Sequence, residues 1–194
     1  MDLYLKFALP FFTLFLFVKS ACATDWKREK LPHGLESAVI EAKASFNGNT
    51  VPAKIRLICY SGSGLDINLQ IDVLDTTVFS GFNFDDFEGP DAPFGASKLA
   101  QVNVSDGVNS TIYKSAGGGW FSEHNQFRFD IPLQGKYAHG GDELVSFLDK
   151  PLTSVSVIFH EKLKVNQLLE VKAVDIAQNA QLLEVLALCK KGKR

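Results

Sequence analysis

The chain has 194 residues, of which 46% are hydrophobic and 22% charged, and its formal net charge is −2. A chain of this length and composition is globular rather than disordered and has room for one ordinary domain. Its near-neutral charge gives no general electrostatic basis for binding nucleic acid. Only about the first eighteen residues are continuously apolar, which excludes a protein with several membrane-spanning helices.

Residues 1–23 have the three parts of a secretory signal peptide. Lys6 supplies a positive charge, residues 7–18 form an apolar run, and residues 21–23 (Ala-Cys-Ala) are a small-residue cleavage site. The run is too short for a stable anchor, since a spanning helix needs about 20 apolar residues. A lipoprotein is disfavoured because Lys19 stands where its signal has an aliphatic residue. We therefore expect an exported protein, periplasmic or extracellular, without a stable membrane anchor.

Two cysteines, Cys59 and Cys189, remain after this cleavage. An even pair in an exported chain is most simply a disulfide, and two separate buried thiols are the alternative. The chain has no Cys-x-x-Cys motif. We therefore expect a structural bond rather than a catalytic pair of thiols.

Strict alternation of apolar and polar residues predicts three antiparallel strands in the first half of the mature chain. Their expected core-facing residues are Ala38, Ile40, Ala42, Ala44 and Phe46; Val51, Ala53, Ile55, Leu57 and Cys59; and Leu65, Ile67, Leu69, Ile71 and Val73.

The register between these strands follows from side-chain parity, because paired residues share one side of the sheet. A two-residue turn at Asn47-Gly48 places Glu41 opposite Lys54. A three-residue loop at 62–64 places Lys54 opposite Asp72. We expect all three charged residues on the solvent side of the sheet.

Similar patterns predict four more strands and two helices. The strands lie near residues 100–104, 127–133, 155–159 and 169–173, and the helices near 142–149 and 176–189, the second with Asp175 as its N-cap. The predicted fold class is α+β: residues 24–194 form a single β-rich domain with one antiparallel β-sheet or a sandwich-like arrangement, and the helices cover one side or end.

Motifs for catalysis and for cofactor binding are missing from the sequence. Ser61-Gly62-Ser63-Gly64 lacks the spacing of a nucleophile elbow, and Gly117-Gly118-Gly119 is not followed by the lysine of a phosphate-binding loop. The four histidines show no metal-ligand spacing. We therefore predict no catalytic residues, no metal site and no cofactor.

The segment 81–95 is the most unusual part of the chain, because phenylalanines alternate with acidic residues. Its candidate binding residues are Asp85, Asp86 and Glu88. One interpretation is a loop that the aromatic rings hold on the core, with the carboxylates in water. A partner-binding loop is the second interpretation, and a calcium site that departs from the EF-hand ligand order is the third.

The stretch 109–124 places Tyr113, Trp120 and Phe121 around a triple glycine. Rigid aromatic side chains beside an adaptable backbone are typical of recognition loops, and these three are candidate binding residues. The alternative is a hairpin in which Trp120 covers an edge of the core.

These patterns favour an exported small binding protein, of the inhibitor or immunity type, that acts on an enzyme of the cell envelope. Its expected partner is a protein of the envelope, and its oligomeric state is not predicted. The alternative is a periplasmic hydrolase whose acid and base come from distant segments, for example Asp86 and His124.

Overall fold

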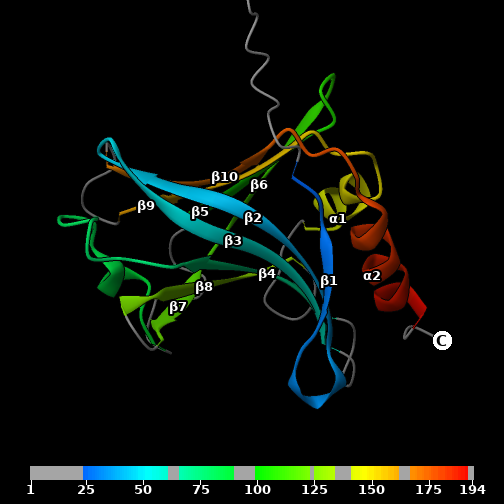
Figure 1. The fold of residues 1–194 in the computed structure, drawn as a ribbon, viewed down its shortest axis with the longest axis horizontal. Helices are drawn as coiled ribbons and strands as arrows, with labels where there is room; N and C mark the ends of the chain where they lie inside the picture. The colour runs from blue at the N-terminus through cyan, green and yellow to red at the C-terminus, as the bar shows by residue number, and fades with distance from the viewer. Residues whose placement is uncertain are drawn as a thin grey trace, which may run out of the picture.

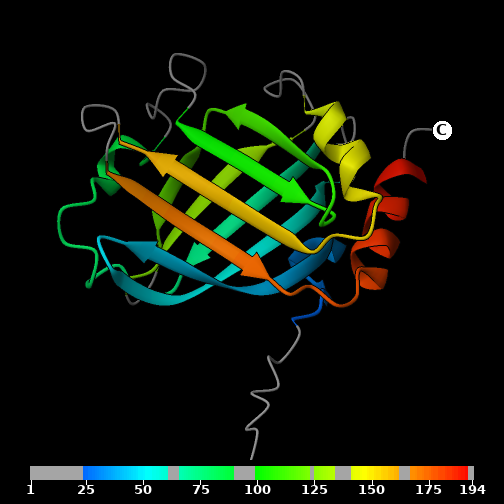
Figure 2. The same ribbon diagram turned by 90° about the horizontal axis from the view of Figure 1, so that it is seen from above.

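A computed structural model describes residues 24–60, 66–89, 99–122, 125–133, 141–161 and 167–191. The described residues form one antiparallel ten-stranded sheet in the order β6-β5-β9-β10-β2-β3-β4-β8-β7, with β1 paired to β2. The sheet curls into a half-barrel, and α1 and α2 lie at one end of it (Figures 1 and 2). The strands are β1 (Lys27–Lys30), β2 (Glu36–Phe46), β3 (Asn49–Tyr60), β4 (Asp66–Val73), β5 (Ala100–Ser105), β6 (Ser110–Ser115), β7 (Gly118–Phe121), β8 (Phe127–Pro132), β9 (Ser154–His160) and β10 (Leu168–Val174); the helices are α1 (Asp142–Leu148) and α2 (Ala180–Lys191), with short 3-10 turns η1 (Pro32–Gly34) and η2 (Phe84–Asp86).

The predicted antiparallel sheet with two helices is confirmed, and of the two arrangements predicted for it the single sheet is present. Every strand of the described chain belongs to the same curled sheet. The sandwich-like alternative therefore fails, and the architecture is mainly β rather than α+β. The curl lets the sheet bury one face against itself, so the domain needs no second layer.

The predicted register between β2, β3 and β4 is confirmed. Glu41 pairs with Lys54, and Lys54 pairs with Asp72. Asn47 and Gly48 both have positive φ, 47° and 83°, as a two-residue type I′ turn requires. The loop expected at 62–64 lies outside the described residues.

Asp72 lies on the predicted face but not in water. Its exposed fraction is 6%, so its expected solvent position is wrong. Long side chains from the neighbouring strands surround its carboxylate and remove it from solvent. The pattern of alternation identifies the face of a sheet, but it carries no information on what covers that face.

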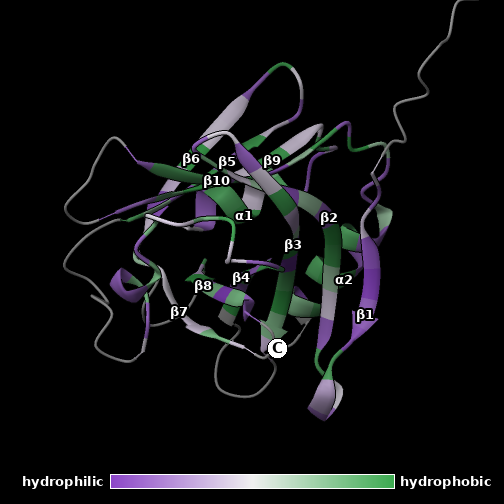
Figure 3. Ribbon diagram, turned by 60° about the vertical axis from the view of Figure 1, so that its left-hand side comes forward, coloured by the Kyte–Doolittle hydropathy of each residue, from purple (hydrophilic) through white to green (hydrophobic). Residues whose placement is uncertain are grey.

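The interior of the curled sheet is filled by aromatic side chains. The rings of Phe129 and Phe159 are stacked with centroids 3.8 Å apart, and Phe87 meets both edge-on. Figure 3 shows apolar residues along β3, while β1 is hydrophilic. The largest fully buried aromatic side chains are Phe46, Phe79, Phe87, Phe127, Phe129 and Phe159.

A disulfide joins Cys59, near the end of β3, to Cys189 of α2, with their Cα atoms 5.5 Å apart. The helix packs its buried face against the sheet through Leu182, Val185 and Leu186. The predicted pairing of the two cysteines is therefore present, and it is compatible with an exported protein. Within the described residues, no helix combines the length and the apolar character needed to cross a membrane.

The start of the second helix differs from its prediction. Asp175 has a φ of 55° and Ile176 forms a bridge with Thr24, so neither is helical. The helix begins at Ala180, and the N–H of Leu183 donates to the carbonyl of Asn179. Because Ile176 is buried in the core, the chain needs several residues to leave β10 before it can turn into α2.

Candidate functional site

The two segments that the sequence marks as unusual lie side by side in the structure. The N–H of Gly119 in β7 donates to the carbonyl of Phe87 at 2.6 Å, and the N–H of Gly89 donates to the carbonyl of Gly119 at 3.0 Å. Glu88 and Gly119 thus form a parallel bridge. We call Asp85, Asp86, Glu88, Trp120 and Phe121 the acidic–aromatic surface.

Buried phenylalanines hold the acidic half of this surface in place. Phe82, Phe84 and Phe87 are 6%, 7% and 0% exposed. The Phe82 ring meets Phe84 edge-on at 4.8 Å and stacks on Phe87 at 5.9 Å. The backbone N–H of Asn83 also donates a hydrogen bond to the buried carboxylate of Glu161, at 3.0 Å. These contacts fix the backbone that carries the carboxylates.

The acidic side chains between these anchors point away from the core. Asp85 and Glu88 are exposed, and Asp86 is half-buried and accepts a hydrogen bond from Asn83 Nδ2 at 2.8 Å. No group of three or more potential metal ligands gathers anywhere in the described part of the chain. Asp91, which the calcium interpretation also needs, lies outside it.

The aromatic half of the surface is formed by β7. Trp120 is 47% exposed and Phe121 is 43% exposed. As neighbours on a strand they point to opposite faces. Phe121 contacts the rings of Phe84 at 5.9 Å and Phe127 at 4.9 Å, so it joins the acidic segment to the aromatic core. Trp120 lies on the outer face, where it pairs in register with Arg128.

Gly119 allows β7 to lie this close to its neighbours. A Cβ atom at this position would be 2.4 Å from Phe127 Cε1 and 2.5 Å from the carbonyl oxygen of Arg128. Any side chain would therefore push β7 away from β8. The glycine here serves close packing of two strands rather than the flexibility of a recognition loop.

Tyr113 does not belong to this surface. It lies on β6, is 5% exposed, and its hydroxyl donates to the carbonyl of Pro132 at 3.0 Å. Its predicted place beside Trp120 and Phe121 is therefore wrong, because the three residues are close along the chain but not in space. In the structure the first half of that stretch pairs with β5 and the second half with β8.

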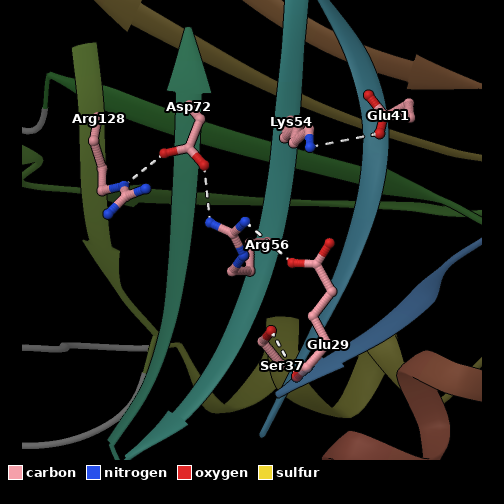
Figure 4. Close-up of polar contacts among 7 residues, drawn as sticks. All are labelled: Glu29, Ser37, Glu41, Lys54, Arg56, Asp72 and Arg128. Carbon is pink, nitrogen blue, oxygen red and sulfur yellow. Dashed lines mark hydrogen bonds and ion pairs between the residues drawn. The ribbon is translucent and has the colours of Figure 1, made fainter. Parts of the chain in front are cut away.

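A charged network on the outer face of the sheet was not anticipated from the sequence (Figure 4). Asp72 accepts from Arg56 at 2.8 Å and from Arg128 at 2.6 Å, and Arg56 also meets Glu29 at 3.3 Å. The expected pair Glu41–Lys54 is present with a separation of 3.8 Å. The parity of the strands placed these residues on one face, but the neighbours of β4 come from distant parts of the chain.

Asp130 lies beside this network on β8. Its Oδ1 is buried without a hydrogen-bond partner among the described residues. Burial raises the pKa of Asp130 to about 6, and the charge of Asp72 adds to the rise, whereas a hydrogen bond from Gln70 and the charge of Arg128 oppose it. Compared with the unfolded chain, the folded protein therefore shifts this carboxyl toward its protonated form.

Replacement of this group predicts a pH-dependent gain in stability. The pKa of Asp130 is higher in the folded protein than in the unfolded chain, so wild-type stability falls as the pH rises from about 4 to about 6. We expect Asp130→Asn to raise the free energy of unfolding by about 2 kcal/mol at pH 7 and to have little effect below about pH 4. Denaturant titrations at both pH values measure this difference. A gain of the same size at both, or one shared by Asp25→Asn, which removes an exposed carboxylate, contradicts it.

The acid–base pair considered for a hydrolase stays a prediction, because the structure describes only one of its two residues. Asp86 lies in η2 with its carboxylate bound by Asn83. His124 lies outside the described residues, so the structure does not place it.

Comparison with protein-family models, with curated proteins and with solved structures finds no match for this chain.

Proposed function

We propose that this chain is an exported binding protein of the inhibitor or immunity type, which binds a protein of the cell envelope through the acidic–aromatic surface. The observation that carries the proposal is the convergence of two segments, each unusual in sequence, on one exposed edge of the sheet. The signal-peptide pattern and the disulfide support the exported location.

The exposure of the aromatic pair favours binding over a purely structural role. Trp120 and Phe121 stay nearly half exposed, whereas the neighbouring rings of Phe82, Phe84 and Phe87 are buried. Tryptophan at the centre of an interface is among the residues that contribute most to affinity. The buried phenylalanines beneath hold the surface rigid, so that little conformational entropy is lost when a partner binds.

Trp120→Ala tests this proposal. We expect it to weaken binding of the envelope partner by about 2 kcal/mol or more, because an exposed aromatic anchor is lost. We expect little change in the free energy of unfolding, because the side chain is 47% exposed. The wild type and the variant are compared by capture from envelope extract, followed by titration of the captured partner, with a thermal melt of each protein.

The matched control is Ile112→Ala, which removes another exposed apolar side chain, 60% exposed, from β6. It should leave capture unchanged. A Trp120→Ala protein that captures the same partner with unchanged affinity would remove the acidic–aromatic surface from the proposal.

A further inference from the structure

We propose that Asn47 is a site of spontaneous modification, where the side-chain amide is lost as ammonia and the residue becomes aspartate or isoaspartate. This chemistry does not depend on the proposed function, and it takes place in the turn between β2 and β3.

The sequence supplies the reacting groups. Asn47 is followed by Gly48, and the chain has no second Asn-Gly dipeptide. When the backbone nitrogen of Gly48 attacks Cγ of Asn47, a nitrogen–carbon bond forms and the bond from Cγ to the amide nitrogen breaks. Ammonia leaves with the proton of the attacking nitrogen, and water then opens the five-membered succinimide at either carbonyl. Glycine favours the attack because it has no side chain to hinder its nitrogen.

The structure leaves both reacting groups accessible. Asn47 and Gly48 are exposed and are the two central residues of the turn, outside the paired residues of β2 and β3. Among the described residues, no hydrogen bond holds the side chain of Asn47 or the backbone N–H of Gly48. The rotation that brings these two groups together therefore does not have to break a hydrogen bond of either one.

The Asp106-Gly107 dipeptide can form the same succinimide with loss of water, but its fold opposes the reaction. The N–H of Gly107 donates to Ser105 Oγ at 3.0 Å. The Asp106 carboxylate accepts from the N–H groups of Val108 at 2.9 Å and Asn109 at 2.6 Å. The hydrogen bond from Asn109, followed by that from Val108, lowers the pKa of Asp106. The carboxylate therefore stays ionised and has no hydroxyl to release as water.

Isoaspartate changes the turn itself. It adds a carbon atom to the backbone between positions 47 and 48, whereas the register of β2 and β3 depends on a two-residue turn with positive φ at both positions. Glu170 lines the same surface cavity as Asn47, so it also repels the new carboxylate. The modified hairpin should therefore be less stable than the original.

The experiment compares the purified protein, with its disulfide intact, and the same protein unfolded in denaturant, both incubated at mildly alkaline pH. Peptide mapping by mass spectrometry measures deamidation at Asn47 and at Asn125, which is also exposed with positive φ but is followed by glutamine. Methyl labelling by an isoaspartate-specific methyltransferase measures isoaspartate at positions 47 and 106.

We expect Asn47 to react about tenfold faster than Asn125, or more, in the folded protein, because a glycine follows it. Folding should slow isoaspartate formation at Asp106 more than at Asn47, because hydrogen bonds hold both reacting groups of the Asp106-Gly107 dipeptide.

Asn47→Gly is the matched variant. Glycine accepts the φ of 47° and has no amide, so the variant should keep its melting temperature during incubation and gain no isoaspartate in the turn. The aged wild type should melt several degrees lower than fresh protein.

Three results would overturn the inference. They are no deamidation of Asn47 in the folded protein, deamidation of Asn125 at the same rate, or suppression by folding as strong at Asn47 as at Asp106. An aged wild type that melts like fresh protein overturns the expected effect on the hairpin.

Discussion

Removal of the disulfide by Cys59→Ala together with Cys189→Ala should lower the free energy of unfolding by about 4–5 kcal/mol. The bond joins residues 130 positions apart, so it strongly restricts the unfolded chain. It also fastens α2 to the end of β3, where Leu182, Val185 and Leu186 are buried. Denaturant titration of the variant, and of the wild type with and without reductant, measures the effect.

The reduced wild type is the control, because it loses the bond and keeps both side chains. Its free energy of unfolding should be close to that of the double variant. Mass spectrometry of the exported protein should find a Cys59–Cys189 cross-link in a chain that begins at Thr24. Free thiols in that protein, or a loss of stability within about 1 kcal/mol, would show that the bond does not have this role.

Asp72→Ala should lower the free energy of unfolding by about 3–5 kcal/mol. The guanidinium of Arg56 keeps its buried charge but loses one of its carboxylate partners. The side chains of Asp72 and Arg56 are 9% and 10% exposed, so water cannot replace the lost contact. Arg128 loses its partner in the same step. The measurement is the free energy of unfolding from denaturant titration.

Two variants test the explanation. Glu41→Ala removes the carboxylate of a more exposed ion pair in the same sheet, and we expect little change. Arg56→Met combined with Asp72→Ala should be more stable than Asp72→Ala alone, because the unpaired buried charge is gone. Equal stability of the single and double variants would mean that the cost comes from lost packing and not from charge.

The local structure of this protein is largely determined by its sequence. Alternation and a two-residue turn were sufficient to pair Glu41 with Lys54, and alternation with the expected three-residue loop was sufficient to pair Lys54 with Asp72. A glycine before and a proline after were sufficient to place α1. Two of these signals are local: the two-residue period predicts which face of a strand is buried, and the turn predicts the register. The even number of cysteines left after cleavage predicts the disulfide, whose residues are 130 positions apart.

The candidate site depended on the tertiary structure. Segment 82–89 has no pattern that points to β7, and their contact arises because the curled sheet brings Phe87 and Gly119 together. Tyr113 and Trp120 are close in sequence, yet one is in the core and the other in solvent, because the chain passes from one edge of the sheet to the other between them.

The tertiary structure also decided which residues of the outer face are buried. Alternation placed Asp72 on that face, but its low exposure follows from arginines on β3 and β8, and β8 is more than fifty residues away in the chain. Sequence periodicity therefore determined which side of the strand each residue occupies. Only the pairing of distant strands decided which residues are neighbours, since that choice depends on the closure of the whole sheet around its aromatic core.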